Sequence, residues 1–357
     1  MPFLASNASG RDRFSPTRAD GFRQERRVRV RGAHMIAGGR SPYSLDVIIA
    51  TYNRKEMLQT AIRSVLDLQP PLGMTVRVIV ADNNSADGTR DLVKSLSCVL
   101  DKRLHYLFEP RQGKSYALNS AIAAAEGDLV AIIDDDEEVQ PDWLNRVFDL
   151  FQNPTVQYAG GRTLPKSITL LPGWVPTSEF RAVIGWAEGP SETCLYTAND
   201  PKVFLMGGNA VFRREFLQAM GPTPYNVKFG RKGGGLLTAD DDMYERVLAT
   251  GAMGVYDPTL IVHHAVQPHM LTKRYYRRWC FWCAVSCGAL ERTQPSPGSS
   301  VLGVPRWKLR RGIESLGRLF LRKCSPDRNQ RNRSFVDELH VVQTAGLLYG
   351  RFFFRAS

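Results

Sequence analysis

Five acidic residues in succession, Asp134–Glu138, directly follow a short apolar segment over 129–133. Neighbouring carboxylates repel one another unless a cation or solvent relieves the repulsion. Asp134 and Asp136 are two positions apart, so an extended backbone projects both side chains to the same side. Hard carboxylate oxygens suit Mn²⁺ or Mg²⁺, which usually keep water and substrate phosphate as further ligands. The run therefore predicts a metal–phosphate site, with a solvated surface loop as the alternative.

Polar residues also follow the other apolar segments in this part of the chain. They are, in chain order, Thr51, Tyr52, Asn53, Asp82, Asn83, Glu109, Arg111 and Lys114. Amides, hydroxyls and carboxylates in such clusters can recognise a base and a ribose through hydrogen bonds. The alternative is a set of turns with helix caps, since Asn, Asp, Ser and Gly are the usual turn residues.

Short apolar segments alternate with helix-period stripes up to residue 151, which defines the elements that must position these side chains. The predicted strands cover 45–51, 76–81, 104–109 and 129–133. Asn53 and Glu56 predict a capping box at the start of the first helix. The alternation predicts an α/β fold with right-handed crossovers, a mostly parallel, doubly wound sheet and helices on both faces. Ligands of such sheets bind beyond the carboxyl ends of the strands.

The composition suits a globular protein and excludes a wholly disordered, collagenous or coiled-coil chain. Of the 357 residues, 43% are hydrophobic and 23% are charged. The formal net charge of +12 is uneven: residues 1–44 contribute +6, residues 45–272 contribute −6 and residues 273–357 contribute +12. The basic ends could meet an anionic membrane surface, or serve only solubility.

These shifts predict three parts: a basic, disordered segment over 1–44, a catalytic domain over 45–270 and a basic, mainly helical extension over 271–357. No run of 18 apolar residues occurs, which argues against a spanning helix. The N-terminus has no apolar core of a secretory signal, and the six cysteines are sparse. We therefore expect a cytoplasmic location, with peripheral contact at the inner face of the membrane left open.

The ordered set of segments resembles the family 2 glycosyltransferases of GT-A fold. In chain order, over about 45–265, the segments are LDVIIATYNRKEMLQTAIRSVL, VIVADNNSADGT, EPRQGKSYALNSAI, AIIDDDEEVQPDWL, GGNAVFRREFL and GRKGGGLLTADDDMYERVLATG. The resemblance implies metal-dependent, inverting and non-processive transfer of a sugar from a nucleotide diphosphate, most simply a UDP-sugar. It implies a hydroxyl acceptor, either a sugar or a lipid-linked sugar, in polysaccharide or glycolipid synthesis.

The resemblance also implies roles for individual residues. The nucleotide would be bound by Thr51, Tyr52, Asn53, Asp82, Asn83, Lys114, Asp134 and Asp135. Asp136 and Asp134 would hold Mn²⁺ or Mg²⁺, with His263 or His264 as a further group near the metal. Gly208, Asn209 and Trp279 would lie on the acceptor side, and the Gly-rich run 230–235 would close over donor or acceptor as a mobile loop, unless it is an inert connection.

The segment TADDDMYERV supplies the catalytic base under the same resemblance. Arg246 matches the arginine that closes the family's acidic pattern, and this register makes Asp240 the base, with Asp241 as the alternative. Ala239 stands where the family commonly has Glu, so the usual acidic pair is incomplete. The competing interpretation is a helix start, where carboxylates interact favourably with the helix dipole.

The C-terminal part carries two weaker signals. Cys280, Cys283 and Cys287 have the spacing of one helix face and lack a fourth zinc ligand, which predicts buried structural thiols. Within 301–323, the apolar residues Leu309, Ile313, Leu316 and Phe320 have helical spacing, with arginines off that stripe. Such a helix could lie on an anionic membrane or pack on the catalytic domain, and the sequence leaves both open.

Two other functions remain as alternatives. A sugar-nucleotide nucleotidyltransferase would also use carboxylate-held metal, but its usual Gly-rich loop after the first strand is replaced here by TYNRKE. A protein that binds nucleic acid or an anionic surface through its basic ends, with a degenerate active site, is the other. No nucleic-acid partner is expected, because no recognisable binding motif occurs and the central part is acidic.

Overall fold

A computed structural model describes most of the chain beyond the basic N-terminal segment. The described residues are 42–100, 103–166, 171–197, 203–228, 239–292, 299–301, 303–324 and 328–354, without the side chains of 323 and 328–333. The predictions for residues 1–41 and for the Gly-rich run 230–235 lie outside them.

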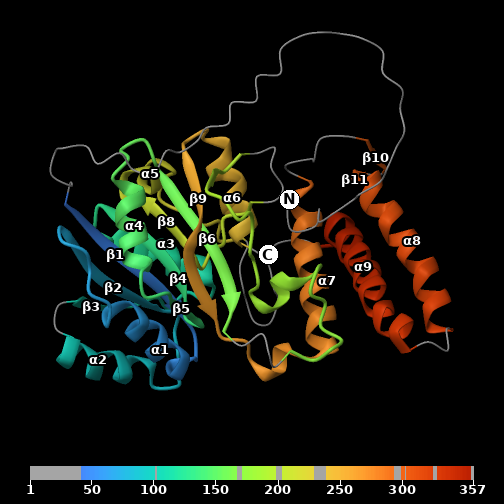
Figure 1. Cartoon of the computed structure of the whole chain (residues 1–357), viewed down its shortest axis with the longest axis horizontal. Helices are drawn as coiled ribbons and strands as arrows, with labels where there is room; N and C mark the ends of the chain where they lie inside the picture. The colour runs from blue at the N-terminus through green and yellow to red at the C-terminus, as the bar shows by residue number, and fades with distance from the viewer. Residues whose placement is uncertain are drawn as a thin grey trace, which may run out of the picture.

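A nine-stranded mixed sheet forms the centre of the molecule (Figure 1), in the order β3-β2-β1-β4-β8-β6-β9-β5 with β7 paired to β9. The strands are β1 (Tyr43–Thr51), β2 (Met74–Asp82), β3 (Leu104–Phe108), β4 (Leu129–Asp134), β5 (Glu137–Val139), β6 (Tyr158–Pro165), β7 (Cys194–Leu195), β8 (Ala210–Arg213) and β9 (Gly254–His264). Strands β1 to β4 pair in parallel, which confirms the predicted α/β class. Strand β8 extends the sheet as an antiparallel neighbour of β4, which the sequence did not predict.

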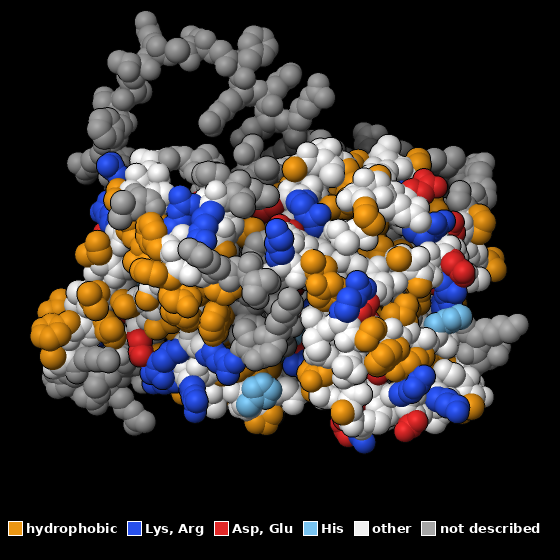
Figure 2. Space-filling model, turned by 180° about the vertical axis from the view of Figure 1, so that it is seen from behind, with side chains coloured by type: hydrophobic (Ala, Val, Ile, Leu, Met, Phe, Trp, Pro, Cys, Tyr) orange, Lys and Arg blue, Asp and Glu red, His pale blue; other side chains and the backbone are white. Residues whose placement is uncertain are grey.

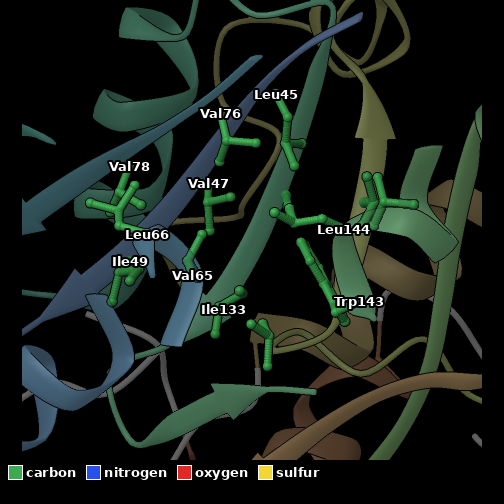
Figure 3. Packing of buried hydrophobic residues seen from close by; sticks show 14 of the residues in the cluster. Leu45, Val47, Ile49, Val65, Leu66, Val76, Val78, Ile133, Trp143 and Leu144 are labelled. Carbon is green, nitrogen blue, oxygen red and sulfur yellow. The ribbon is translucent and has the colours of Figure 1, made fainter. Parts of the chain in front are cut away.

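Helices cover both faces of this sheet because successive strand side chains point to opposite sides. They are α1 (Lys55–Leu66), α2 (Thr89–Leu100), α3 (Lys114–Ala124), α4 (Trp143–Phe151), α5 (Arg214–Ala219) and α6 (Ala239–Ala249). Val47 and Ile49 of β1 join a core with α1, α2 and α4 (Figure 3), whereas Ile48 joins a second core with α3, α5 and α6. Each such side chain contributes about 1.5–3 kcal/mol when fully buried.

The turn between β1 and α1 differs from the predicted capping box. Asn53 has a left-handed backbone, with φ of +52°, and the residue at the N-cap is Arg54, which makes no side-chain cap hydrogen bond. The Asn53 Oδ1 atom instead accepts a hydrogen bond of 2.7 Å from the Ala86 amide. The capping-box prediction is therefore wrong, because the amide of Asn53 fastens this turn to the turn that follows β2.

Three long helices form the C-terminal part, on the right of Figure 1, with α9 between the other two. The elements after the sheet are η5 (Pro268–Met270), α7 (Lys273–Leu290), β10 (Ser300–Val301), β11 (Val304–Pro305), α8 (Arg306–Lys323) and α9 (Arg328–Phe352). Gly350 permits close packing of α9 on α7, since a Cβ atom there would lie 2.1 Å from the Val285 carbonyl oxygen.

Helix α7 also carries the three cysteines of the sequence pattern. Cys280, Cys283 and Cys287 are buried and free, which confirms the prediction of structural thiols. A further cluster joins this helix to η4 (Arg181–Ile184) and to the segment before it. Among the residues that the structure describes, no helix combines the length and the apolar character that crossing a bilayer requires.

Candidate active site

The carboxyl ends of β1, β2 and β4 lie side by side at one edge of the sheet. In the parallel register, Thr51 pairs with Asp82, and Ala50 pairs with Asp134. This register brings together the polar clusters that lie far apart in the sequence, as the doubly wound topology predicts.

Asp82 is buried at the end of β2 and held in a fixed orientation. Its Oδ2 atom accepts a hydrogen bond of 2.7 Å from the Tyr106 hydroxyl, and its Oδ1 atom accepts one of 2.9 Å from the Ser85 amide. Burial raises the pKa of Tyr106, and the hydrogen bond to Asp82 raises it further, so the phenol remains a donor. The carboxylate therefore stands pre-oriented beside Thr51 and the half-exposed Tyr52.

Asn83 holds the loop that leads into α3. Its Nδ2 atom donates to the carbonyl oxygens of Glu109 and Arg111, at 3.2 and 2.6 Å, and its Oδ1 atom accepts from the Gly113 amide at 2.7 Å. These bonds engage both ends of the Asn83 amide. We therefore assign Asn83 to positioning this loop, whose next residue, Lys114, forms an ion pair with Asp134.

A cation that the sequence analysis did not single out lies inside the acidic run. The Arg54 Nη1 atom lies 2.9 Å from Asp135 Oδ1 and 2.8 Å from Asp136 Oδ2. Asp135 also accepts a hydrogen bond of 2.8 Å from the Thr51 hydroxyl, and burial raises its pKa to about 6 despite the arginine. The signal for Arg54 in the sequence was its place in the Tyr-Asn-Arg turn at the end of the first strand.

His264 is the histidine that approaches the acidic run. Its Nε2 atom lies 3.6 Å from Asp136 Oδ2, and its buried Nδ1 atom has no hydrogen-bond partner among the described residues. His263, the other histidine that the sequence analysis named, points to the other face of β9 and pairs with Glu138 across the strands. A carboxylate and an imidazole therefore converge here, although the described residues include no group of three or more side chains that could hold a metal ion by themselves.

Two adjacent glycines, Gly207 and Gly208, allow the candidate base Asp240 and Glu137 of the acidic run to pack against the same backbone segment. A Cβ atom at Gly207 would lie 2.3 Å from Asp240 Oδ1, and one at Gly208 would lie 2.1 Å from Glu137 Oε2. Both carboxyl groups therefore pack directly on the backbone that precedes β8. Burial raises the pKa of Glu137, and the charges of Asp134 and Asp136 raise it further.

Tyr225 lies near both Asp240 and Asp134 of the acidic run. Burial raises its pKa, the charges of Asp240 and Asp134 raise it further, and Lys114 lowers it. Asp240 and Tyr225 line a small cavity together with Leu205, Gly207, Ala210, Phe212, Met243 and Tyr244. The base candidate, the acidic run and the lysine of α3 thus share one region of the structure.

The three aspartates at the start of α6 face different surroundings. Asp242 forms an ion pair of 3.0 Å with Arg246, one turn further along the helix. Asp241 is buried near α7, where the pKa of Cys283 is raised by its hydrogen bond with Cys287, by burial and by further charges that include Asp241. Only Asp240 of the three lines the cavity with Gly207 and Tyr225.

One of the predicted acceptor-side residues lies in the packed interior, and another is partly buried. Asn209 is fully buried: its Oδ1 atom accepts from Trp143 Nε1 at 3.1 Å, and its Nδ2 atom donates to the carbonyl oxygens of Arg162 and Leu260. Trp279 packs against the cluster between α7, α9 and η4. The Asn209 side chain is therefore used within the fold, the acceptor-side role of Trp279 stays a prediction, and Gly208 lies beside Glu137 of the acidic run.

Sequence comparisons agree with this geometry. The profile described as Glycosyl transferase family 2 matches residues 46–221. A glucosyl-dolichyl phosphate glucuronosyltransferase of Haloferax volcanii is 30% identical over 262 residues, which cover 70% of this chain and 78% of the relative. The chain belongs to glycosyl transferase family 2.

Further comparisons place this glycosyltransferase among bacterial and archaeal proteins. The succinoglycan biosynthesis protein ExoM of Rhizobium meliloti is 28% identical over 239 residues, which cover 65% of this chain and 72% of that protein. Among solved structures, the mannosyltransferase PcManGT of Pyrobaculum calidifontis, in complex with GDP-Man and Mn²⁺, matches with a TM-score of 0.59 at 17% identity, over 86% of this chain and 88% of that one. The last similarity confirms the GT-A fold of the glycosyltransferase.

Proposed function

We propose that this glycosyltransferase transfers a sugar, with inversion and without processivity, from a nucleotide diphosphate donor to a hydroxyl acceptor. UDP-sugars are the first donors to test, and a sugar chain or a lipid-linked sugar is the proposed acceptor. The names of the relatives support this acceptor class, since one is a succinoglycan biosynthesis protein and another acts on a glucosyl-dolichyl phosphate.

The observation that carries the proposal is the convergence of three groups at one edge of the sheet. Asp82 and Thr51 stand where a base and a ribose would be recognised. Asp134 ends the neighbouring strand β4, Asp136 lies two residues beyond it, and Asp240 adjoins the same site through Gly207. Donor recognition, phosphate binding and proton removal therefore have residues within one continuous region.

Asp136 and His264 would hold the divalent metal, with Asp134 turned toward the diphosphate. When bound, the metal would neutralise negative charge that develops on the leaving diphosphate. Lys114, which pairs with Asp134, adds positive charge on the donor side. Arg54 would hold Asp135 and Asp136 in place through its ion pairs with both.

Asp240 is the proposed general base. Its carboxylate would accept the proton of the acceptor hydroxyl as that oxygen attacks the anomeric carbon from the face opposite the diphosphate. Such a direct displacement inverts the anomeric configuration, because the new bond forms on the opposite side from the bond that breaks. Because Gly207 has no side chain, the Asp240 carboxylate lies directly against the backbone at this position. A larger residue at position 207 would displace the carboxylate.

The direct test is a panel of UDP-, GDP-, CDP- and dTDP-sugars incubated with the purified protein and Mn²⁺, with release of the nucleoside diphosphate as the readout. We expect turnover of at least one donor, and loss of that turnover in Asp240→Asn. Turnover that is unchanged in Asp240→Asn would contradict the assigned base. Absence of turnover with every donor and with sugar acceptors added would contradict the proposed activity.

A further inference from the structure

Helix α8 exposes five large apolar side chains on the outside of the molecule, whereas its Leu309 packs against a buried cluster. The residues of this outer stripe are Trp307, Ile313, Leu316, Phe320 and Leu321, and they are 47–72% exposed. α8 is also the helix furthest from the sheet in Figure 1. A helix on the surface of a globular protein normally shows the reverse arrangement, with its apolar stripe toward the core.

The inner face of α8 is charged, and its charges are matched by acidic groups of neighbouring elements. Arg318 and Arg322 both form ion pairs with Asp337 of α9. Arg311 pairs with Glu179, which also contacts His340 at 2.8 Å.

The N-terminal turn of α8 is held in the same way. Lys308 and Glu291 form an ion pair of 3.3 Å that is almost completely buried. A rotation of α8 that hid the outer stripe would leave buried carboxylates such as Asp337 and Glu291 without these cations, which is costly inside a protein. The ion pairs therefore fix the orientation that exposes the outer stripe.

Basic residues lie on the same exposed face of α8, between members of the outer stripe. Arg306 is exposed, and Arg310 is 82% exposed. The acidic residue on this side, Glu314, lies 2.7 Å from Arg310 and 3.7 Å from Arg318, so its charge is offset. Figure 2 shows the rear of the molecule, where hydrophobic side chains gather over the C-terminal helices at the left, with Lys and Arg side chains above and below them.

We propose that the outer stripe of α8 binds the surface of a bilayer that contains anionic phospholipid, with the helix lying in the plane of the interface. Exposed apolar side chains together with Lys and Arg are the combination by which interfacial helices bind anionic lipid. The net charge of +12 over residues 273–357 is complementary to an anionic surface. A single helix at the edge of the molecule presents a convex surface. Such a surface suits a flat lipid bilayer better than it suits a peptide, which would need a groove.

This surface is connected to the candidate active site through α9 and α7. Strand β9 ends at His264, and α7, which packs on α9, begins at Lys273. A docked α8 would therefore hold the site close to the membrane surface. The proposal does not depend on glycosyl transfer, since it concerns lipid binding by the C-terminal helices alone.

The test is co-sedimentation of the full-length protein with vesicles of phosphatidylcholine, alone or mixed with phosphatidylglycerol. We expect binding to the mixed vesicles that weakens at high salt. The variant Ile313→Ser/Leu316→Ser/Phe320→Ser should lower the partition coefficient at least about tenfold, because each truncation removes apolar area from the interface. The matched control is Leu72→Ser/Val99→Ser, which removes side chains that are 97% and 81% exposed on the catalytic part and should bind as the wild type does.

Arg306→Gln/Arg310→Gln separates the electrostatic contribution and should weaken binding to mixed vesicles while leaving the unfolding temperature unchanged. The proposal is overturned if the wild type does not bind mixed vesicles, or if the triple variant binds as tightly as the wild type. It is also overturned if light scattering shows a wild-type dimer that the triple variant converts to a monomer, since the stripe would then join two copies of the chain.

Discussion

Two of the regions that bury carboxylates differ in how far neighbouring cations balance the negative charge. Between α8 and its neighbours, each described carboxylate has one or two cationic partners: Asp337 contacts two arginines, and Glu291 contacts Lys308. At the end of β4, Asp134, Asp135, Asp136 and Glu137 are crowded around Arg54 and Lys114. The balanced region fixes the orientation of a helix. The crowded region retains negative charge that a divalent cation can offset, which is the property a metal–diphosphate site needs.

The largest effect should come from the proposed base, Asp240, beside the crowded region. Asp240→Asn should lower the rate of sugar transfer by about 10²–10⁴-fold, because it removes general base catalysis. Donor affinity should stay within about twofold, since the base acts on the acceptor. The control Asp241→Asn, at the buried position toward α7, should retain most of the activity. Steady-state kinetics and donor titration of both variants measure these effects. A large loss of activity in Asp241→Asn, with activity retained in Asp240→Asn, would contradict the assignment.

Removal of a carboxylate from the balanced region should affect stability rather than chemistry. Asp337→Asn leaves Arg318 and Arg322 without their shared acceptor and should lower the free energy of unfolding by about 2 kcal/mol. Turnover per folded molecule should be unchanged. Denaturant unfolding measures the first effect, and a proportionate loss of turnover at low temperature would contradict the second.

Removal of a carboxylate from the crowded region should cost less stability. Asp136→Asn relieves repulsion with its acidic neighbours, so the free energy of unfolding without metal should change by less than about 1 kcal/mol. Stabilisation by added Mn²⁺, seen as a rise of the unfolding temperature in the wild type, should disappear in the variant. If Asp136→Asn without metal were as destabilised as Asp337→Asn, the proposed difference between the two regions would be contradicted.

The smallest effect concerns a balanced pair at the border of the site. Hydrogen bonds from Arg111 lower the pKa of Glu109 to about 2, against the opposing effect of burial. This ionised carboxylate stabilises the fold above its ordinary pKa, and the stabilisation is lost as pH falls toward about 2. Glu109→Gln should therefore be less stable by about 1 kcal/mol at neutral pH, because Arg111 is exposed to solvent. Thermal unfolding at several pH values should show the difference from wild type disappearing in acid, and a constant difference would contradict the pairing.

The first half of the fold was predictable because its signals are local. Strands β1 to β4 are continuous apolar segments, and the helices between them have clear periodicity. Strands β6, β8 and β9 were not predicted, since β8 pairs with β4 and β6 far away in the sequence, and tertiary packing decides such pairing. The helix over Arg306–Lys323 was predicted, but a stripe in a sequence does not show whether a neighbouring element covers it.

The candidate site was predictable in the same partial way. The residues at strand ends were found because strand ends of parallel sheets share one edge. Arg54 was missed because its role depends on reaching across from β1 to the end of β4. Asn209 was assigned to the acceptor side, but its amide is used inside the fold, where it bonds to α4, β6 and β9. Sequence position indicates which edge a residue is near, and contacts decide what the side chain does there.

The central claim is that the crowded carboxylates bind a nucleotide diphosphate through a divalent metal. Calorimetric titration of UDP into the wild-type protein, first with Mn²⁺ and then with EDTA, tests it most directly, with GDP, CDP and dTDP as the next ligands. The account predicts binding of one nucleotide that requires the metal and is lost in Asp136→Ala. Binding that is equally tight in EDTA, or that survives Asp136→Ala unchanged, would contradict the claim.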